Sequence, residues 1–310
     1  DVTVTDKNGK IVTDLKPEDF EVFENGEKQA ITNFSFITSV PEAKTTPTPK
    51  PDKNVVGAPI PPVTLRPEQV RRTVALVVDD LGLSFESISF VRRALKKFVD
   101  EQMQPNDLVA IIRTGSGVGA LQQFTSDKNQ LYAAIEKIRW NPLGRAGIGA
   151  FAPIEQDPTE ETQEQEEEEP GVRDPEKEFN EFREDIFSVG TLGAINFVVK
   201  GMDELPGKKS IMLFSDGFAI CNPESPDRCA RLQDSLRELT DLCNRASVTI
   251  YTQDARGLAY TGLTAADWVN GNQQSIQSAM SSRSAELFNK QEGLAYLARE
   301  TGGKAVLNSN

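Results

Sequence analysis

One strand followed by two acids constrains this chain more than any other feature. Residues 73–84 read TVALVVDDLGLS, and residues 74–78 are an unbroken apolar, mostly β-branched run. Such a run is typical of a strand covered on both faces, as in a parallel sheet flanked by helices. Because the run ends at Asp79 and Asp80, it delivers carboxylates to the carboxyl edge of that sheet, where open α/β folds hold their functional sites.

Strands and helices alternate from residue 72 onward, which predicts an α/β, doubly wound, Rossmann-like domain. The strand at 121–124 follows its predecessor after only a glycine-rich turn, which is too short for a crossover helix, so we expect an antiparallel edge strand there. The prediction is a mostly parallel six-stranded sheet with one antiparallel edge strand. The other strands are expected at 74–78, 108–112, 210–214, 248–252 and 304–307, with helices at 87–101, 125–140, 179–205 (interrupted near Gly190), 228–246 and 291–300, and with 258–290 only partly helical.

Composition divides the chain into three parts. Residues 1–37 alternate apolar and polar positions around Asn-Gly turns, which predicts a small β unit too short to build its own core. Residues 38–71 are rich in proline and threonine, typical of an extended linker. Residues 72–310 form the main domain, within which about 141–177 are expected to be an inserted acidic surface loop.

Charge and composition exclude several classes of function. The net charge of −13 comes largely from nine acids in residues 155–169, and no basic patch suggests nucleic acid. The chain has no histidine, which removes the commonest general base and most zinc sites, so we expect a non-enzymatic protein. No apolar stretch reaches about 18 residues, so no membrane span is expected.

Three cysteines indicate the compartment. Cys221 and Cys229 bracket a loop that a disulfide could close, and such a bond would imply an oxidising environment. Cys243 lies at helical spacing with apolar residues and is expected to be a buried free thiol. We therefore expect a secreted or cell-surface protein, extracellular or periplasmic, whose signal peptide has been removed.

Oxygen-bearing side chains from three separate segments are predicted to meet at the sheet edge. Asp80 and Ser84 follow the first strand, Asp216 follows the strand at 210–214, and Thr191 opens a helical stretch between them. Two carboxylates and two hydroxyls are hard donors that suit Mg²⁺ or Mn²⁺. The alternative is that each acid only caps a strand end or a helix N-terminus, where carboxylates are favoured anyway.

These residues resemble the von Willebrand factor A (vWA) domains, and more closely the VWFA-related group of secreted Acidobacterial proteins. The resemblance covers residues 72–308, and DFEVFENGEKQAITNF at 19–34 is similar to the segment that precedes the domain in that group. It implies a metal-ion-dependent adhesion site built from a D-x-S-x-S loop, a distant threonine and an aspartate in a DG turn. Asp80, Ser84, Thr191 and Asp216 match this pattern, whereas Gly82 replaces the first serine. Binding of Mg²⁺, Mn²⁺ or Ca²⁺ is therefore expected to be weakened, unless a water or Asp79 substitutes.

The leading interpretation is a non-enzymatic adhesion or protein-interaction domain with a degenerate metal site. A partner protein would complete the metal shell with an acidic side chain. A second interpretation is a structural subunit of an extracellular surface assembly or filament, a homo-oligomer held together through residues 1–37. A third is Mg²⁺-dependent phosphoryl chemistry, for which no catalytic lysine is evident.

Overall fold

The computed structural model describes residues 70–116, 124–154, 175–220, 226–268 and 273–309, and parts of 4–31 (positions 4, 6–7, 12, 14–24 and 26–31). The chain divides into two compact units, Asp1–Pro61 and Pro62–Asn310. The linker predicted at 38–71 lies outside the described residues except for its last two positions.

The smaller unit contains a two-stranded antiparallel sheet. A short 3₁₀ helix (Pro17–Asp19) precedes β1 (Val22–Glu24), which pairs with β2 (Glu27–Gln29). Gly26 lies in the connecting turn with a φ of 85°, a conformation that glycine adopts without steric cost. Val22 and Phe23 are 49% and 58% exposed, so this sheet does not cover its own apolar side chains.

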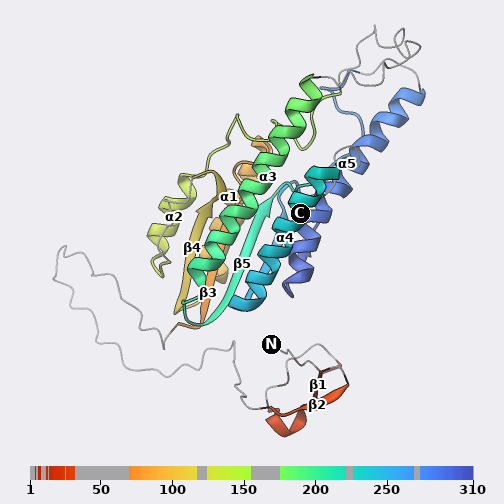
Figure 1. Ribbon diagram of the computed structural model, residues 1–310. Helices are drawn as coiled ribbons and strands as arrows, with labels where there is room; N and C mark the ends of the chain where they lie inside the picture. The colour runs from red at the N-terminus through yellow and green to blue at the C-terminus, as the bar shows by residue number, and fades with distance from the viewer. Residues whose placement is uncertain are drawn as a thin grey trace, which may run out of the picture. The chain divides into compact units, whose positions relative to one another are not determined.

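The larger unit is built on a five-stranded parallel sheet with the order β4-β3-β5-β6-β7, of which Figure 1 labels β4, β3 and β5. The central strand β3 is the apolar run before the two acids, and every one of its residues after the first is buried. The strands are β3 (Arg72–Val78), β4 (Asp107–Arg113), β5 (Lys208–Ser215), β6 (Val248–Asp254) and β7 (Ala305–Val306).

The prediction of six strands was wrong by one. Among the described residues, the expected antiparallel edge strand is reduced to a single bridge between Val109 and Thr125, closed by two backbone hydrogen bonds of 2.9 Å. The chain leaves the sheet at once because the Thr125 hydroxyl accepts the N–H of Asp127, which caps the following helix. Residues 121–123 lie outside the described part of the chain.

Helices cover both faces of the sheet, as the doubly wound prediction requires. Val74, Leu76 and Val78 pack with α1 (Phe85–Lys97) and α2 (Lys128–Glu136), which lie on one face. Ala75 and Val77 share the other core with α3 (Pro175–Met202), α4 (Pro226–Ala246) and α5 (Gln273–Glu300). Cys243 is buried in this second core as a free thiol, as predicted. No helix in the described residues is long and apolar enough to cross a membrane.

Two helices are longer than the sequence predicted. α3 runs through Gly190 without interruption, because burial of apolar residues after it, such as Ile195 and Val199, outweighs the cost of about 1 kcal/mol for a helical glycine. α5 already begins at Gln273, in a polar segment with little apolar periodicity. Its N-terminal half is anchored by the buried Arg283, which pairs with Asp267.

The first part of the predicted acidic loop is packed against the domain. Residues 141–154 lie against the start of α1, where Phe85 and Glu86 donate their backbone N–H groups to the carbonyls of Gly147 and Ile148 over 3.2 Å. Residues 155–174 lie outside the described residues, and α3 begins at Pro175, before the predicted end of the loop.

Candidate functional site

Three neighbouring strands carry buried aspartates at their carboxyl ends. Asp79 and Asp80 follow β3, Asp216 follows β5, and Asp254 ends β6. Since β5 lies between β3 and β6, these acids share one edge of the sheet. Each must find a partner there, because a buried carboxylate is costly unless it is hydrogen-bonded or paired with a cation.

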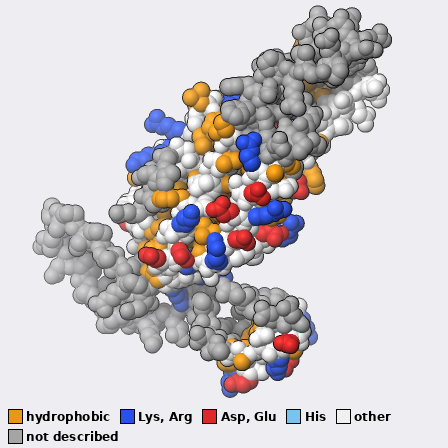
Figure 2. Space-filling view, viewed as in Figure 1, with side chains coloured by type: hydrophobic (Ala, Val, Ile, Leu, Met, Phe, Trp, Pro, Cys, Tyr) orange, Lys and Arg blue, Asp and Glu red, His pale blue; other side chains and the backbone are white. Residues whose placement is uncertain are grey.

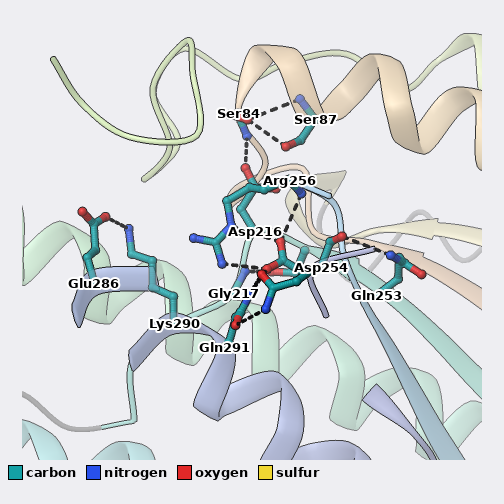
Figure 3. Close-up of polar contacts among 12 residues, drawn as sticks. Ser84, Ser87, Asp216, Gly217, Gln253, Asp254, Arg256, Glu286, Lys290 and Gln291 are labelled. Carbon is teal, nitrogen blue, oxygen red and sulfur yellow. Dashed lines mark hydrogen bonds and ion pairs between the residues drawn. The ribbon is translucent and has the colours of Figure 1, made fainter. Parts of the chain in front are cut away.

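Asp216 links the β5 turn to the start of α1. Its Oδ2 accepts the backbone N–H of Ser84 over 2.8 Å, and Ser84 caps α1 through Ser87 (Figure 3). The turn requires Gly217, which has a φ of 88° and lies against the backbone of Lys290. Asp216 Oδ1 is buried, and no hydrogen-bond partner for it is found among the described residues. Burial raises the pKa of Asp216, and the backbone N–H of Ser84, the hydroxyls of Ser84 and Ser87 and the charge of Arg256 only partly oppose this shift.

Asp79, not Asp80, meets Thr191. The Thr191 hydroxyl donates to Asp79 Oδ1 over 2.8 Å, and the Ser215 hydroxyl donates to Oδ2 over 2.7 Å. Asp80 instead turns toward the end of β4, where its Oδ1 accepts the backbone N–H of Gly115 over 2.7 Å. Burial raises the pKa of Asp80, although the Gly115 N–H opposes the shift. Asp79, which was predicted only as a possible substitute, therefore makes the contact with Thr191, whereas the predicted ligand Asp80 contacts Gly115.

A guanidinium lies at the centre of this edge. Arg145 Nη2 pairs with Asp79 Oδ2 at 2.5 Å and donates to the Gly217 carbonyl over 3.2 Å, while Nη1 donates to the Thr191 hydroxyl over 3.3 Å. The side chain of Arg145 is 4% exposed, and that of Asp79 is fully buried. The charge of Asp79 is therefore neutralised by an arginine from residues 141–154.

The glycine at position 82 makes room for this arginine. A Cβ built on Gly82 would overlap the guanidinium of Arg145 and the carboxylate of Asp79. Gly82 does not have a positive φ, so space and not backbone strain excludes a side chain. The position where the sequence departs from the vWA pattern is thus the position that contacts Arg145.

A second arginine neutralises the acid at the end of β6. Arg256 binds Asp254 through Nε and Nη2, each at 3.0 Å, and Gln291 donates to Asp254 Oδ2 over 2.7 Å (Figure 3). Asp216, between these two ion pairs, has no such arginine partner among the described residues. It borders a cavity of about 110 Å³ whose lining also includes Gly82, Arg145, Arg256, Glu286 and Lys290.

The four predicted ligands therefore do not contact one another as a single group in the structure. Ser84 and Asp216 are in direct contact, Thr191 joins Asp79 and Arg145, and Asp80 faces Thr114 and Gly115. No role was predicted for Arg145, because it lies in a segment expected to be an inserted loop. Asp254 was also missed, although an acid directly after a predicted strand was the signal used for Asp80 and Asp216.

The donor set accommodates a hard cation only in part. Asp216 lines the cavity, and its Oδ1 has no hydrogen-bond partner among the described residues; Ser84 contacts Asp216, and Thr191 contacts Asp79. Mg²⁺ suits such a set because it retains waters and needs only one or two carboxylates. In the described part of the chain, no three His, Cys, Asp or Glu side chains are grouped to hold an ion, so hydroxyls and waters would have to complete the shell.

Comparisons with known proteins do not assign this chain to a family. No protein-family model matches the sequence, and no curated protein matches it. Among solved structures, it is similar to an aerotolerance-related membrane protein from Bacteroides fragilis, with 14% identity and a TM-score of 0.36. That similarity covers 76% of this chain and 90% of the other.

Proposed function

We propose that the larger unit is a vWA-like, non-enzymatic protein-interaction domain that binds its partner at the carboxyl edge of the sheet. In this proposal a divalent cation, Mg²⁺ or Mn²⁺, binds weakly at Asp216, Ser84 and Thr191, with Asp79 or Asp80 nearby. An acidic side chain of the partner completes its shell. The proposal includes an extracellular or cell-surface location, which depends on the Cys221–Cys229 disulfide. Cys221 lies outside the described residues.

The observation that carries the proposal is the unsatisfied carboxylate oxygen of Asp216. Buried polar atoms are nearly always hydrogen-bonded, and the exceptions mark strained or functional positions, or missing waters and ions. Here the exception lies at the carboxyl edge of a parallel sheet and beside a cavity. A cation would supply the missing partner and offset the desolvation that raises the pKa of Asp216.

The surface around the cavity favours a protein partner. Ile148, between two cavity-lining glycines, is 69% exposed. An exposed apolar side chain at the rim of a polar cavity fits the contact surface of a protein partner. The face of the larger unit in Figure 2 intersperses acidic and basic side chains, with no patch of a single sign to attract nucleic acid.

Metal binding to the intact protein tests the proposal. We expect Mn²⁺ or Mg²⁺ to raise the unfolding temperature, since a ligand at 100 times its Kd stabilises by about 2.7 kcal/mol. Asp216→Asn should abolish the shift, whereas Asp241→Asn, at an exposed position of α4, should leave it intact. Calorimetric titrations that are the same for the Asp216 variant and the wild type would rule out the metal site.

A second candidate function is a structural subunit of an extracellular assembly. The exposed Val22 and Phe23 of β1 favour it, because the described part of the smaller unit leaves them uncovered. If the unit docks on a neighbouring molecule, the intact chain will be oligomeric in light scattering. Removal of residues 1–37, or the double substitution Val22→Ser and Phe23→Ser, will then give a monomer. A monomeric intact chain at working concentration would exclude this candidate.

A further inference from the structure

We propose that Arg145 is an internal, displaceable cation that competes with a divalent ion for the sheet edge and thereby keeps the site closed. This inference rests on the proposed metal site at Asp216 and names its regulator. Arg145 contacts Asp79, Thr191 and the carbonyl of Gly217, the residue next to Asp216. An ion held by Asp216 and Thr191 would be adjacent to this guanidinium, so the two positive charges repel each other and share an oxygen donor.

Gly82 leaves the space that this guanidinium occupies. A serine there would place its side chain where the guanidinium now lies, so the glycine and the arginine accommodate each other. The volume beside residue 82 therefore holds a permanent positive charge and no side-chain oxygen.

The backbone around Arg145 is fixed, which confines the movement to the side chain. The N–H of Arg145 donates to the Leu81 carbonyl over 2.8 Å, and Gly144 packs so closely on that carbonyl that a Cβ would collide with it. The bonds from α1 to Gly147 and Ile148 hold the following residues. Opening therefore requires a change of side-chain rotamer and not the unfolding of the loop.

The cavity offers the guanidinium an alternative partner. Arg145 and Glu286 line the same cavity of about 110 Å³, a volume sufficient for several waters. Glu286 is paired with Lys290 at 2.7 Å, and Lys290 also lies 3.7 Å from Glu184. If Lys290 moves to Glu184, Glu286 becomes free to receive the guanidinium. Entry of a cation beside Asp216 would drive this exchange of partners.

The test is Mn²⁺ binding to the full chain, measured as free Mn²⁺ by electron paramagnetic resonance and by calorimetry. Arg145→Met removes the guanidinium with its charge and keeps an unbranched side chain up to about the position of Nε, and we expect at least a tenfold tighter Kd. Arg145→Lys keeps the charge and should stay within about threefold of the wild type, because a retained cation still repels the ion. Arg139→Met, at an exposed position, is the matched control and should change nothing.

Stability provides a second measurement. In EDTA, Arg145→Met should be less stable than the wild type, since Asp79 loses its cation, and added Mn²⁺ should restore much of the loss. If this variant does not fold, Gly82→Ser, which evicts the guanidinium by its volume, should also tighten Mn²⁺ binding.

The outcomes separate this inference from the proposed function. Equal Mn²⁺ affinities for the wild type, Arg145→Met and Gly82→Ser, together with loss of binding in Asp216→Asn, would overturn the competition and leave the metal site standing. Absence of Mn²⁺ binding in every variant would overturn both.

Discussion

Gly82 and the guanidinium of Arg145 cannot both keep their places if a side chain is added at residue 82. The vWA pattern has a serine there, and the backbone would accept one because the φ of Gly82 is not positive. In this protein, however, the new Cβ would overlap the guanidinium and the carboxylate of Asp79. We therefore expect Gly82→Ser to destabilise the protein in the absence of metal.

The cost follows from the contacts that the serine disrupts. Adding a side chain to a packed interior costs about 1–3 kcal/mol, and depriving a buried charge of its partner costs about 3–5 kcal/mol. Asp79 keeps its bonds from Thr191 and Ser215, so we expect Gly82→Ser to cost about 3 kcal/mol. For a unit of this size, that lowers the unfolding temperature by roughly 6–12 °C.

A double-mutant cycle makes the reasoning testable. Arg145→Met alone should cost about 3–5 kcal/mol, because it also leaves Asp79 without its cation. In the double variant, the serine enters space that the guanidinium has vacated, so its additional cost should almost vanish. The two substitutions should therefore fall short of additivity by about 2–3 kcal/mol, near the upper end for residues in contact.

The assay is urea unfolding of the full-length variants, followed by circular dichroism in EDTA. Gly147→Ser is the matched control, since a Cβ there meets nothing within 4 Å, and its effect should stay within about 0.5 kcal/mol. Additive costs, or a Gly82→Ser variant as stable as the control, would refute the claim that Arg145 fills the space beside Gly82.

Two further predictions concern other parts of the domain. Burial raises the pKa of Cys243 to about 12, so its thiol should resist alkylation at pH 8 in the native protein and react after denaturation. Rapid labelling of the native protein, detected by mass spectrometry, would contradict the placement of Cys243 in the core. The bonds from Arg283 hold the pKa of Asp267 well below its usual range. This carboxylate therefore stabilises the fold at pH values above its unfolded pKa of about 3.9, and the stabilisation is lost as the pH falls below that value. Asp267→Asn should therefore flatten the acid limb of the stability curve between about pH 5 and 2, and an unchanged acid limb would count against the pair.

Most of the sheet could be predicted because its strands are local patterns. The apolar runs of β3, β5 and β6 are covered on both faces, and each was recognisable from its own residues. The prediction of a sixth strand was wrong because the described residues pair only through one bridge, between Val109 and Thr125. The cap of the next helix at Asp127 ends this pairing. The N-terminal half of α5 was not predicted because its sequence is polar. The ion pair between Arg283 and Asp267 anchors it, and this pair is not visible in the local sequence pattern.

The candidate site, too, could be predicted from the sequence only in part. The sequence by itself determined that Asp79, Asp80 and Asp216 would lie at one sheet edge, because buried parallel strands end there in acids. Only the tertiary structure decided that Asp79 faces Thr191, that Asp80 turns toward Gly115, and that Arg145 reaches both Asp79 and Thr191 from a loop between α2 and α3. The apolar pattern of a strand predicts at which edge of the sheet a carboxylate lies. The direction it takes, and the cation it meets, depend on packing between segments that lie 66 residues apart for Asp79 and Arg145 and 112 residues apart for Asp79 and Thr191.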